Sequence, residues 1–304
     1  MYDIIVIGGG PAGMTAALYA QRNGKHALVI EKSGFGGQIT HSPKVENLPG
    51  FLSVSGNEFA DKMFSQMLEQ GADFEIETVC GIETDGNKKI VKTEEGSAYE
   101  AYAVIIATGV KHRMLGLPGE EELVGEGISF CAVCDGDFYK GKTVCVAGGG
   151  NSALQEAILL ADKCSEVIML QDLPYFTGEE RLQQVLFSRD NVRSYTGVAI
   201  KELLKKDGEF CGVLIAQDGE TQAVACDGLF VAIGLIPENE PFRNLAALNA
   251  YGYFDSDEQC CTETEGVFVA GDCRSKATRQ VTTAAADGTV AALAACRYIN
   301  NLLA

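Results

Sequence analysis

Two stretches of the chain show the same succession of apolar and polar positions. Residues 2–7 are apolar and rich in β-branched side chains, which predicts a buried parallel strand. A glycine cluster follows at residues 8–13, and residues 14–23 carry apolar side chains at the spacing of a helix. Residues 27–30 predict a second strand, which ends at Glu31. The segment therefore predicts a strand–turn–helix–strand unit closed by an acidic residue.

The same unit recurs in the middle of the chain. Residues 143–147 predict a strand, residues 148–153 form a second glycine-rich turn, and a helix is expected from about residue 153 to residue 164. Residues 167–170 then predict another strand. An internal duplication of this kind indicates two similar nucleotide-binding domains.

Two further apolar strands end in glycine and mark the passages between the domains. They are residues 104–109 and 229–234, and each is followed by a polar, glycine-containing loop with a proline, Pro118 or Pro237. We interpret these two loops as the crossings of the chain from one domain to the other.

The last part of the chain has no glycine turn of its own. It contains an apolar strand at residues 267–272 and an alanine-rich helix at residues 284–300, so it is expected to complete the first domain. We predict an α/β protein with two Rossmann-like, three-layer nucleotide-binding domains, the second inserted in the first. The outer domain would comprise residues 1–114 and 241–304, and the central domain residues 115–240.

Composition narrows the classes of partner. The 304 residues carry a net charge of −18, and such a surface repels nucleic acid and anionic membranes. No apolar run approaches the length that spans a bilayer. Residues 1–10 lack the basic start and the cleavage site of a signal peptide, so we expect a cytoplasmic protein.

The first glycine cluster has the spacing of a dinucleotide-binding turn. Gly8 would make the tight turn, Gly10 would let the backbone approach a pyrophosphate, and Gly13 would let the helix pack on the strand. The pyrophosphate would lie at the helix N-terminus, where free amides and the helix dipole favour anions. Glu31 follows Gly13 at the distance expected of a ribose-binding carboxylate. The alternative is a plain turn in an α/β domain.

A pair of closely spaced cysteines is the second chemical feature. The chain has eleven cysteines, and Cys131 and Cys134 have the spacing of a redox-active dithiol. Asp135 follows directly and can move a proton if burial raises its pKa. A zinc site needs two more ligands, and the adjacent Cys260 and Cys261 are poorly spaced for chelation, so no metal is expected. The other alternative is a pair of buried structural thiols.

Taken together, these motifs resemble the low-molecular-weight thioredoxin reductase family over essentially the whole chain. The motifs occur in one fixed order, which makes the resemblance specific. The residues that carry it are Gly8 to Gly13, Gly36-Gly37-Gln38, Val45 to Gly50, Ala107-Thr108-Gly109, Cys131 to Gly136, Gly148 to Ala153, Gly271-Asp272 and Arg279-Gln280.

The resemblance implies a homodimeric flavoprotein that reduces thioredoxin. Cys134 would face the flavin, Cys131 would attack the disulfide of the partner, and Asp135 would be the acid–base residue. The outer domain would bind FAD, and the central pyridine-nucleotide-type domain would carry the dithiol. The implied FAD-binding residues are Gly8, Gly10, Pro11, Ala12, Gly13, Glu31, Lys32, Gly37, Gln38, Asn47, Val79, Thr108, Gly109, Asp272, Arg279, Gln280 and Val281.

The sequence departs from the family after the second glycine turn. The family usually carries a His-Arg-Arg cluster there, with another arginine four residues beyond, and these cations bind the 2′-phosphate of NADPH. Residues 171–177 are Gln-Asp-Leu-Pro-Tyr-Phe-Thr, so every expected cation is missing. Each lost charge-assisted contact is worth about 1.5–3 kcal/mol, and Asp172 would repel a phosphate. NADPH is therefore not expected to be an efficient donor.

Two other electron donors fit the sequence. NADH is compatible with residues 148–153, because Asp172 or Gln171 can bond a free ribose hydroxyl. Reduced ferredoxin is the second, since the chain resembles the ferredoxin-dependent flavin thioredoxin reductases, a branch that lacks the NADPH determinants. We favour ferredoxin, because Pro174 and the aromatic pair 175–176 occupy the position of the adenosine end.

The charge of the protein argues against ferredoxin, because ferredoxins are themselves acidic. Local basic groups can still dock one, although these groups are equally compatible with a solvated surface and with Arg279 committed to the flavin. The candidates are Lys111, His112 and Arg113, and Arg274, Lys276 and Arg279.

Three other functions remain open from the sequence. The first is an NADH-dependent reductase of another disulfide or of a peroxide system. The second is a flavin and dithiol sensor without steady turnover. The third is a ferredoxin–nicotinamide reductase, which the dithiol disfavours.

Overall fold

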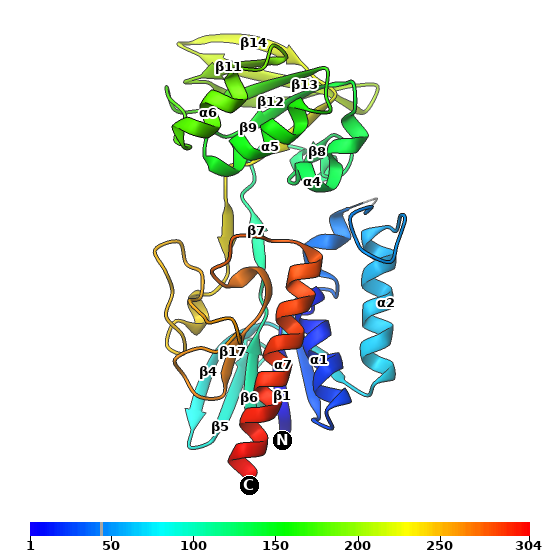
Figure 1. The fold of residues 1–304 in the computed structure, drawn as a ribbon, viewed down its shortest axis with the longest axis vertical. Coiled ribbons are helices and arrows are strands. Elements are labelled where there is room, and N and C mark those ends of the chain that lie inside the picture. Colours follow the sequence, from blue (N-terminus) through cyan, green and yellow to red (C-terminus); the bar gives the residue numbers. More distant parts are fainter. Residues whose placement is uncertain (43–44) are drawn as a thin grey trace. The chain divides into compact units, whose positions relative to one another are not determined.

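The computed structural model describes residues 1–42 and 45–304, which form two compact units. Unit 1 comprises Met1–Pro43, Val54–Lys111 and Ile236–Ala304. Unit 2 comprises Lys44–Ser53 and His112–Leu235. Figure 1 shows the elements of both units.

Unit 1 is built on one mixed sheet with the strand order β3-β2-β1-β6-β5-β4, and β17 pairs with β6. Strands β3, β2, β1, β6 and β17 are parallel, whereas β5 is antiparallel to both β6 and β4. The strands are β1 (Tyr2–Ile7), β2 (Ala27–Glu31), β3 (Asp73–Ile76), β4 (Val79–Asp85), β5 (Lys88–Thr93), β6 (Ala98–Ile106) and β17 (Val267–Val269).

Three helices belong to this sheet: α1 (Pro11–Arg22), α2 (Gly56–Glu69) and α7 (Val281–Leu303). Helices α1 and α7 lie side by side (Figure 1), because Gly288 lets the two backbones meet. A Cβ on Gly288 would lie 2.2 Å from the carbonyl oxygen of Ala12. Ile4 and Val6 of β1 pack in the core on this face of the sheet.

Both predicted helices of unit 1 are confirmed, and both begin three residues earlier than expected. Helix α1 begins at Pro11, which suits a first helical position because proline has no amide hydrogen to leave unpaired. Helix α7 begins at Val281, where a capping box between Gln280 and Thr283 satisfies the first amides.

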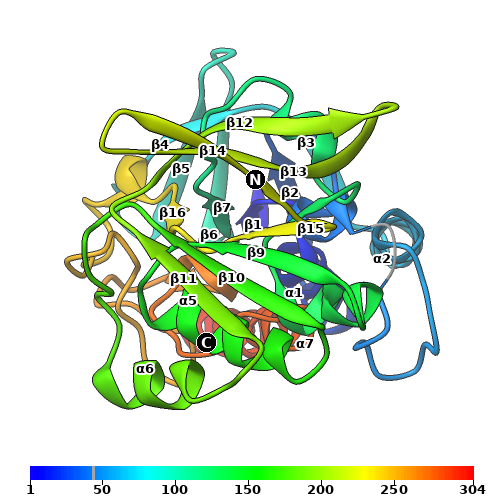
Figure 2. The same cartoon turned by 90° about the horizontal axis from the view of Figure 1, so that it is seen from above.

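Unit 2 contains a parallel sheet with the order β11-β10-β9-β15-β8 and an antiparallel sheet with the order β12-β13-β14. The view of Figure 2 shows both. The parallel strands are β8 (Ile128–Ser129), β9 (Thr143–Ala147), β10 (Glu166–Gln171), β11 (Val192–Thr196) and β15 (Gly228–Val231). The antiparallel strands are β12 (Ala199–Lys206), β13 (Glu209–Gln217) and β14 (Glu220–Ala225).

The parallel sheet of unit 2 is covered on both faces. Val144 and Val146 of β9 pack against Leu154 of helix α5 (Asn151–Ala161), whereas Cys145 packs against the antiparallel sheet, for example against Val213. The remaining helices of this unit are α3 (Glu120–Leu123), α4 (Ala132–Asp135) and α6 (Glu180–Phe187). The predicted α/β class with two Rossmann-like units is confirmed.

The internal duplication extends to the backbone of the two glycine turns. Gly8 and Gly148 have φ values of +108° and +124°, which glycine adopts without strain. A Cβ on Gly8 would lie 2.4 Å from the Ala107 carbonyl oxygen, and one on Gly148 would lie 2.5 Å from that of Ala232. In each unit the first glycine thus lies against the backbone just beyond the end of a neighbouring strand, which is β6 in unit 1 and β15 in unit 2.

The chain passes between the units along two short strands that pair with each other, β7 (Val110–His112) and β16 (Leu235–Pro237). Within residues 1–42 and 45–304, no helix is both long and apolar enough to cross a membrane.

Candidate active site

The carboxyl ends of the parallel strands in unit 1 bring several predicted cofactor residues to one edge of the sheet. Gly8 directly follows β1, Glu31 ends β2, Thr108 comes shortly after β6, and Asp272 follows β17. In open parallel sheets, ligands bind outside this edge, where the loops leave a crevice. The topology of unit 1 therefore assembles residues that are distant in the sequence.

The first glycine turn presents bare backbone. Gly10 caps α1 in an extended conformation with no side-chain hydrogen bond, and a Cβ there would meet only the Cα of Gly37, at 3.9 Å. Gly37 has a φ of +63° and begins the 3₁₀ helix Gly37–His41, which also contains Gln38. A Cβ on Gly13 would lie 1.8 Å from the Gly8 carbonyl oxygen, so only glycine allows this helix start to pack on the turn.

The acidic residue of the first unit is held against the glycine turn. Glu31 Oε2 accepts a 2.7 Å hydrogen bond from the backbone amide of Gly9, and Oε1 accepts one of 3.0 Å from the amide of Ser33. The neighbouring Lys32 forms an ion pair with Glu238. Glu31 is therefore oriented beside the turn, as a ribose-binding carboxylate needs to be.

A buried acidic group lies beyond β17. Asp272 is in the 3₁₀ helix Gly271–Cys273, and its Oδ1 is buried without a hydrogen-bond partner, 3.8 Å from Lys276 Nζ. Burial raises the pKa of Asp272. The guanidinium of Arg279 donates a 3.3 Å hydrogen bond to the backbone carbonyl of Asp272 and lies over the ring of Tyr253.

The other predicted cofactor residues lie at element ends or in the core. Thr108 donates a 3.0 Å hydrogen bond to the Asn239 side chain, and Gly109 has a φ of +67°. Pro11, Ala12 and Val281 lie in the first turns of helices, Gln280 caps α7, Val79 begins β4, and Asn47 lies in the segment that groups with unit 2.

The dithiol lies in unit 2 at the start of the short helix α4. Cys131 caps this helix, so Cys134 returns to the same side, and the two sulfurs form a disulfide with a Cα–Cα distance of 5.3 Å. The amide of Cys134 donates a 3.2 Å hydrogen bond to Cys131 Sγ. Val133, between them, is 52% exposed, whereas both cysteines are partly buried.

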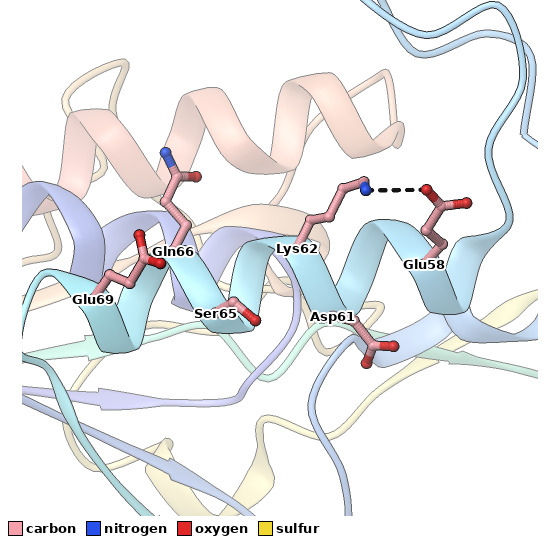
Figure 3. A pocket seen from close by; sticks show the side chains of 6 residues that line it. All are labelled: Glu58, Asp61, Lys62, Ser65, Gln66 and Glu69. Atoms are coloured by element: carbon pink, nitrogen blue, oxygen red, sulfur yellow. Dashed lines mark ion pairs between the residues drawn. The ribbon is translucent and has the colours of Figure 1, made fainter.

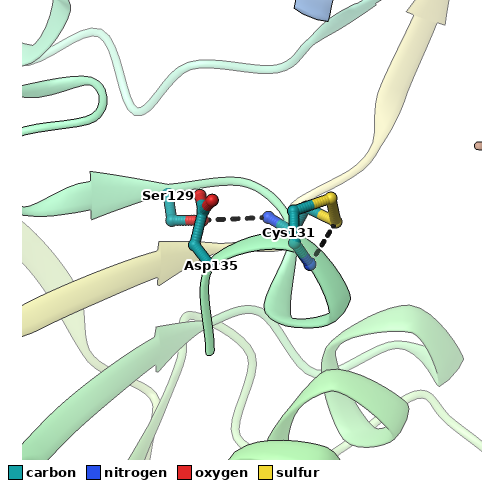
Figure 4. The surroundings of a disulfide bond; sticks show 4 residues. Ser129, Cys131 and Asp135 are labelled. Atoms are coloured by element: carbon teal, nitrogen blue, oxygen red, sulfur yellow. Dashed lines mark hydrogen bonds between the residues drawn. A yellow bond between two sulfur atoms is a disulfide. The ribbon is translucent and has the colours of Figure 1, made fainter. Parts of the chain in front are cut away.

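Asp135 is joined to this turn through Ser129 (Figure 4). The Ser129 hydroxyl donates a 2.6 Å hydrogen bond to Asp135 Oδ2 and accepts one of 3.1 Å from the Cys131 amide. Burial raises the pKa of Asp135, although the bond from Ser129 opposes the rise. Asp135 Oδ1 is buried without a hydrogen-bond partner. These surroundings favour the protonated form of the carboxyl more than water does.

The second glycine turn is covered by the loop that follows β10. Gln171, at the place that Glu31 takes in unit 1, donates to the backbone carbonyl of Tyr175. The amides of Thr177 and Gly178 both donate 2.9 Å hydrogen bonds to the Gly149 carbonyl. The loop is thus fastened to the turn at several points.

Two side chains of this loop lie beside the second glycine turn. A Cβ on Gly150 would meet Thr177 Oγ1 at 3.8 Å, whereas the matching position in unit 1 faces only Gly37. At the start of α5, Asn151 and Glu179 exchange two hydrogen bonds of 3.0 and 2.7 Å. The Glu179 carboxylate is therefore held beside Asn151, in the first turn of α5.

Comparison with known proteins decides the family. Residues 2–288 match the family described as pyridine nucleotide-disulphide oxidoreductase. The chain is 38% identical over 304 residues to the thioredoxin reductase of Bacillus subtilis (strain 168), covering 99% of this chain and 96% of that protein. It is 40% identical over 299 residues to the 34.2 kDa protein in rubredoxin operon of Clostridium pasteurianum, covering 98% and 97%.

Comparison with solved structures leads to the same family. The thioredoxin reductase of Streptococcus pyogenes MGAS5005 superimposes with a TM-score of 0.94 at 37% identity, covering 99% of each chain. The chain belongs to the low-molecular-weight thioredoxin reductase family. The reductase is therefore a flavoprotein disulfide reductase with FAD as its cofactor.

Unit 1 of this reductase fits FAD on two observations. The glycine turn leaves a side-chain-free approach between Gly10 and Gly37, which the pyrophosphate of FAD requires. The buried, unpartnered Oδ1 of Asp272 offers an acceptor for a polar group of the cofactor, since native proteins leave few such atoms unsatisfied.

Sequence reasoning missed three residues beside the dithiol and the second turn. Ser129 is a small polar residue with no spacing signal. Glu156 of α5 is distant in sequence from the dithiol, yet α5 packs on the helix that carries the cysteines, and burial raises the pKa of Glu156 to about 7. Glu179 is one of many surface acids in the sequence. Only the tertiary structure brings these residues to their partners.

The remaining thiols and a surface hollow along α2 offer no further candidate site. Six of the nine free cysteines are buried, and no group of three or more metal-ligating side chains occurs in the described part of the chain. A hollow along α2 is lined by six exposed polar side chains of this one helix, with an ion pair of 3.0 Å between Lys62 and Glu58 (Figure 3). It has no apolar wall to bury a cofactor.

Proposed function

We propose that this reductase transfers electrons from reduced ferredoxin, through FAD and the Cys131–Cys134 dithiol, to thioredoxin. The observation that carries the disulfide step is the Cys131–Cys134 disulfide with a buried carboxyl, Asp135, joined to its turn. Thioredoxin as the substrate is supported by the names of the relatives from Bacillus subtilis and Streptococcus pyogenes.

FAD, held by the glycine turn, Glu31, Thr108, Asp272 and the other predicted residues, supplies the electron pair that opens the disulfide. Cys131, beside the exposed Val133, attacks the disulfide of thioredoxin as a thiolate and forms a mixed disulfide. Cys134 then attacks the Cys131 sulfur, which re-forms the Cys131–Cys134 disulfide and releases thioredoxin with both of its thiols reduced. Asp135 holds and returns the proton exchanged with the sulfurs. One disulfide opens as the other closes, so electrons and protons balance.

The donor proposal rests on the second glycine turn. Residues 171–177 offer no cation to a 2′-phosphate, and the carboxylates of Asp172 and Glu179 would repel one. NADH, the alternative donor, lacks that phosphate but still needs its pyrophosphate at the start of α5. The Glu179 carboxylate is bonded to Asn151 in the first turn of α5, and a negative charge near a helix N-terminus disfavours the pyrophosphate of either nicotinamide cofactor.

A one-electron protein donor is compatible with the name of one relative. The relative in Clostridium pasteurianum is named from a rubredoxin operon, and rubredoxin is an iron protein that carries single electrons. A flavin can collect single electrons and pass on a pair, so this donor class is compatible with disulfide reduction. We place its docking on the basic groups of the sequence, among them Lys111 and Arg113.

The domain limits, the dimer and the location belong to the same proposal. We assign FAD to residues 1–114 and 241–304, the dithiol to residues 115–240, and the assembly to a homodimer, as in the family. The six buried free thiols suit a reducing compartment, which supports a cytoplasmic location.

An anaerobic flavin titration tests the donor. NADPH, NADH and chemically reduced ferredoxin are added separately to the oxidised protein, and the bleaching of the flavin absorbance is followed. We expect fast bleaching by ferredoxin alone. Fast bleaching by NADPH or NADH would overturn the donor proposal while leaving the disulfide step intact.

A turnover assay tests the substrate. Cys134→Ser is expected to keep its FAD and lose thioredoxin reduction, whereas Cys80→Ser, at an exposed free thiol, is expected to keep both. Wild-type protein that bleaches and reoxidises without reducing thioredoxin would instead indicate a sensor or a reductase of another disulfide.

A further inference from the structure

A buried amide joins several loops of unit 1 at the point where the chain returns along β16. Asn239 comes shortly after this strand, and it is 1% exposed. Its Nδ2 donates hydrogen bonds of 2.9 Å to the carbonyl oxygen of Gly252 and of 2.8 Å to that of Cys273. Its Oδ1 accepts a 3.0 Å hydrogen bond from the Thr108 hydroxyl. Both polar atoms of this side chain are therefore bonded.

Two of these three partners lie at the predicted FAD site. A Cβ on Gly8, the first residue of the glycine turn, would lie 3.3 Å from the backbone nitrogen of Thr108. Cys273 directly follows Asp272, whose Oδ1 is buried without a hydrogen-bond partner. The strands that precede these two loops, β6 and β17, pair with each other. Asn239 therefore joins two loops at the carboxyl edge of the sheet.

The preceding residue, Glu238, contacts the same edge in a weaker way. Its carboxylate forms an ion pair of 2.8 Å with Lys111 and a second one with Lys32, which follows β2. These side chains are partly exposed, and ion pairs in contact with water contribute little to stability. The buried hydrogen bonds of Asn239, and not these ion pairs, are therefore expected to fix the loops.

The partners of Asn239 decide which way its amide points. A carbonyl oxygen can only accept, so the bonds to Gly252 and Cys273 must both come from the NH₂ group. The opposite orientation would set Oδ1 against two carbonyl oxygens. Oδ1 therefore faces Thr108, and the single hydrogen of the Thr108 hydroxyl must point at it. Towards any other partner this hydroxyl has only lone pairs to offer.

We propose that Asn239 is a positioning residue of the FAD site, which makes the Thr108 hydroxyl solely an acceptor towards the cofactor. FAD has hydroxyl and ring N–H groups that can donate to this oxygen, whereas its carbonyl and phosphate oxygens cannot. Asn239 acts through Thr108 and through the loop of Asp272. The inference rests on the proposed assignment of Thr108 to the FAD site.

The rate of FAD release from the purified, FAD-bound protein tests the contact. After dilution, released FAD is separated by ultrafiltration and measured by its absorbance. Thr108→Val keeps the shape of the side chain but removes the hydroxyl, and we expect about tenfold faster release, the size of one lost hydrogen bond. Thr108→Ser keeps the hydroxyl and is expected to release FAD at nearly the wild-type rate.

A double variant separates the orientation of the hydroxyl from simple packing. Asn239→Ala alone is also expected to release FAD about tenfold faster. When Thr108→Val is added, the further increase should be small, because the hydroxyl that Asn239 orients is already gone. Release about a hundredfold faster than the wild type, the product of two independent effects, would overturn the inference.

Asn191→Ala is the matched control. Asn191 of unit 2 also donates to two backbone carbonyls, those of Ala161 at 2.9 Å and of Cys164 at 3.1 Å. Its loss is expected to lower the urea midpoint, as the loss of Asn239 does, but to leave FAD release at the wild-type rate. Equally fast release in Asn191→Ala and Asn239→Ala would mean that general destabilisation frees the cofactor, and the inference would fail.

Asn239→Asp keeps the test open if Asn239→Ala does not fold. It retains an oxygen opposite Thr108, and a protonated carboxyl can still donate to one of the two carbonyls. We expect release within about threefold of the wild type at pH 5, since one of the two donated hydrogen bonds remains. Release as fast as in Thr108→Val at this pH would contradict the proposed orientation.

The same measurements distinguish this inference from the assignments on which it rests. Wild-type release in Thr108→Val would refute both the placement of Thr108 at the cofactor and the role of Asn239. Faster release in Thr108→Val, combined with independent effects in the double variant, would refute the role of Asn239 alone. Neither thioredoxin nor an electron donor enters the assay, so its outcome does not depend on the proposed donor or substrate.

Discussion

The Ser129 hydroxyl joins Asp135 to the dithiol: it donates a 2.6 Å hydrogen bond to the carboxylate and accepts a 3.1 Å bond from the Cys131 amide. Ser129 is buried at the end of the edge strand β8, which pairs with β15, so its position is set by the sheet. A change in the protonation of Asp135 therefore alters the hydrogen bond of the Ser129 hydroxyl, which in turn binds the backbone amide of Cys131.

Ser129→Ala is expected to slow thioredoxin reduction about tenfold, because a buried hydrogen bond to a charged group is worth about 1.5–3 kcal/mol. The bond from Ser129 lowers the pKa of Asp135, so its loss should raise this pKa further and move the pH profile of turnover upward. Turnover measured against pH checks both effects. Ser194→Ala, at an exposed serine of β11, serves as the control, and an unshifted profile in Ser129→Ala would contradict the argument.

Gly13→Ala is expected to abolish FAD binding. The new Cβ would lie 1.8 Å from the Gly8 carbonyl oxygen, so α1 must move away from the turn that holds the pyrophosphate. The measurement is the ratio of flavin to protein absorbance after purification. Gly81→Ala is the matched control, because a Cβ there meets no atom within 4 Å, and it should retain full flavin. Equal flavin content in both variants would argue against this site.

The parts of the fold that follow from local patterns were predictable. Both glycine turns, the helices that begin at Pro11 and Asn151, and the insertion of one unit in the other come from apolar runs and glycine spacing. The antiparallel sheet of unit 2 had a usable signal, since the Asp207-Gly208 and Asp218-Gly219 pairs adopt positive φ, as tight hairpin turns require.

The relationships that tune the chemistry were not predictable. Ala132 packs against α5, the helix of Glu156, only in the folded unit, and Glu179 meets Asn151 only because the loop after β10 folds back. Neither pair has a characteristic spacing, and acids are common in this sequence. The absence of cations at residues 171–177 was visible in the sequence, but the carboxylate held at the start of α5 was not.

A double variant, Thr177→Gly with Glu179→Gln, is expected to bind NADH at least about tenfold more tightly than the wild type. It removes the hydroxyl that faces Gly150 and the carboxylate at the start of α5. A tenfold gain in affinity corresponds to roughly 1.4 kcal/mol, the order of magnitude expected when a repelling carboxylate is removed from the start of a helix. Quenching of flavin or protein fluorescence by NADH gives the dissociation constants. Unchanged affinity would show that this loop does not exclude the nucleotide.

Glu156→Gln is expected to stabilise the protein in a pH-dependent way. The pKa of this carboxyl is about 7 in the folded protein and 4.5 as a reference, because burial disfavours the charged form. The unfolded chain therefore loses this proton at lower pH, and wild-type stability falls as the pH rises from about 4.5 through 7. The difference corresponds to up to about 3 kcal/mol above pH 7 and vanishes below pH 4.5.

Urea unfolding of the FAD-bound protein at pH 5 and pH 8 measures this difference. Glu156→Gln should unfold at clearly higher urea than the wild type at pH 8 and at nearly the same urea at pH 5, since the amide carries no charge in either state. Glu121→Gln removes an exposed carboxyl and should show no such dependence. A gain in Glu156→Gln of equal size at both pH values would mean that packing, and not an uncompensated buried charge, separates it from the wild type.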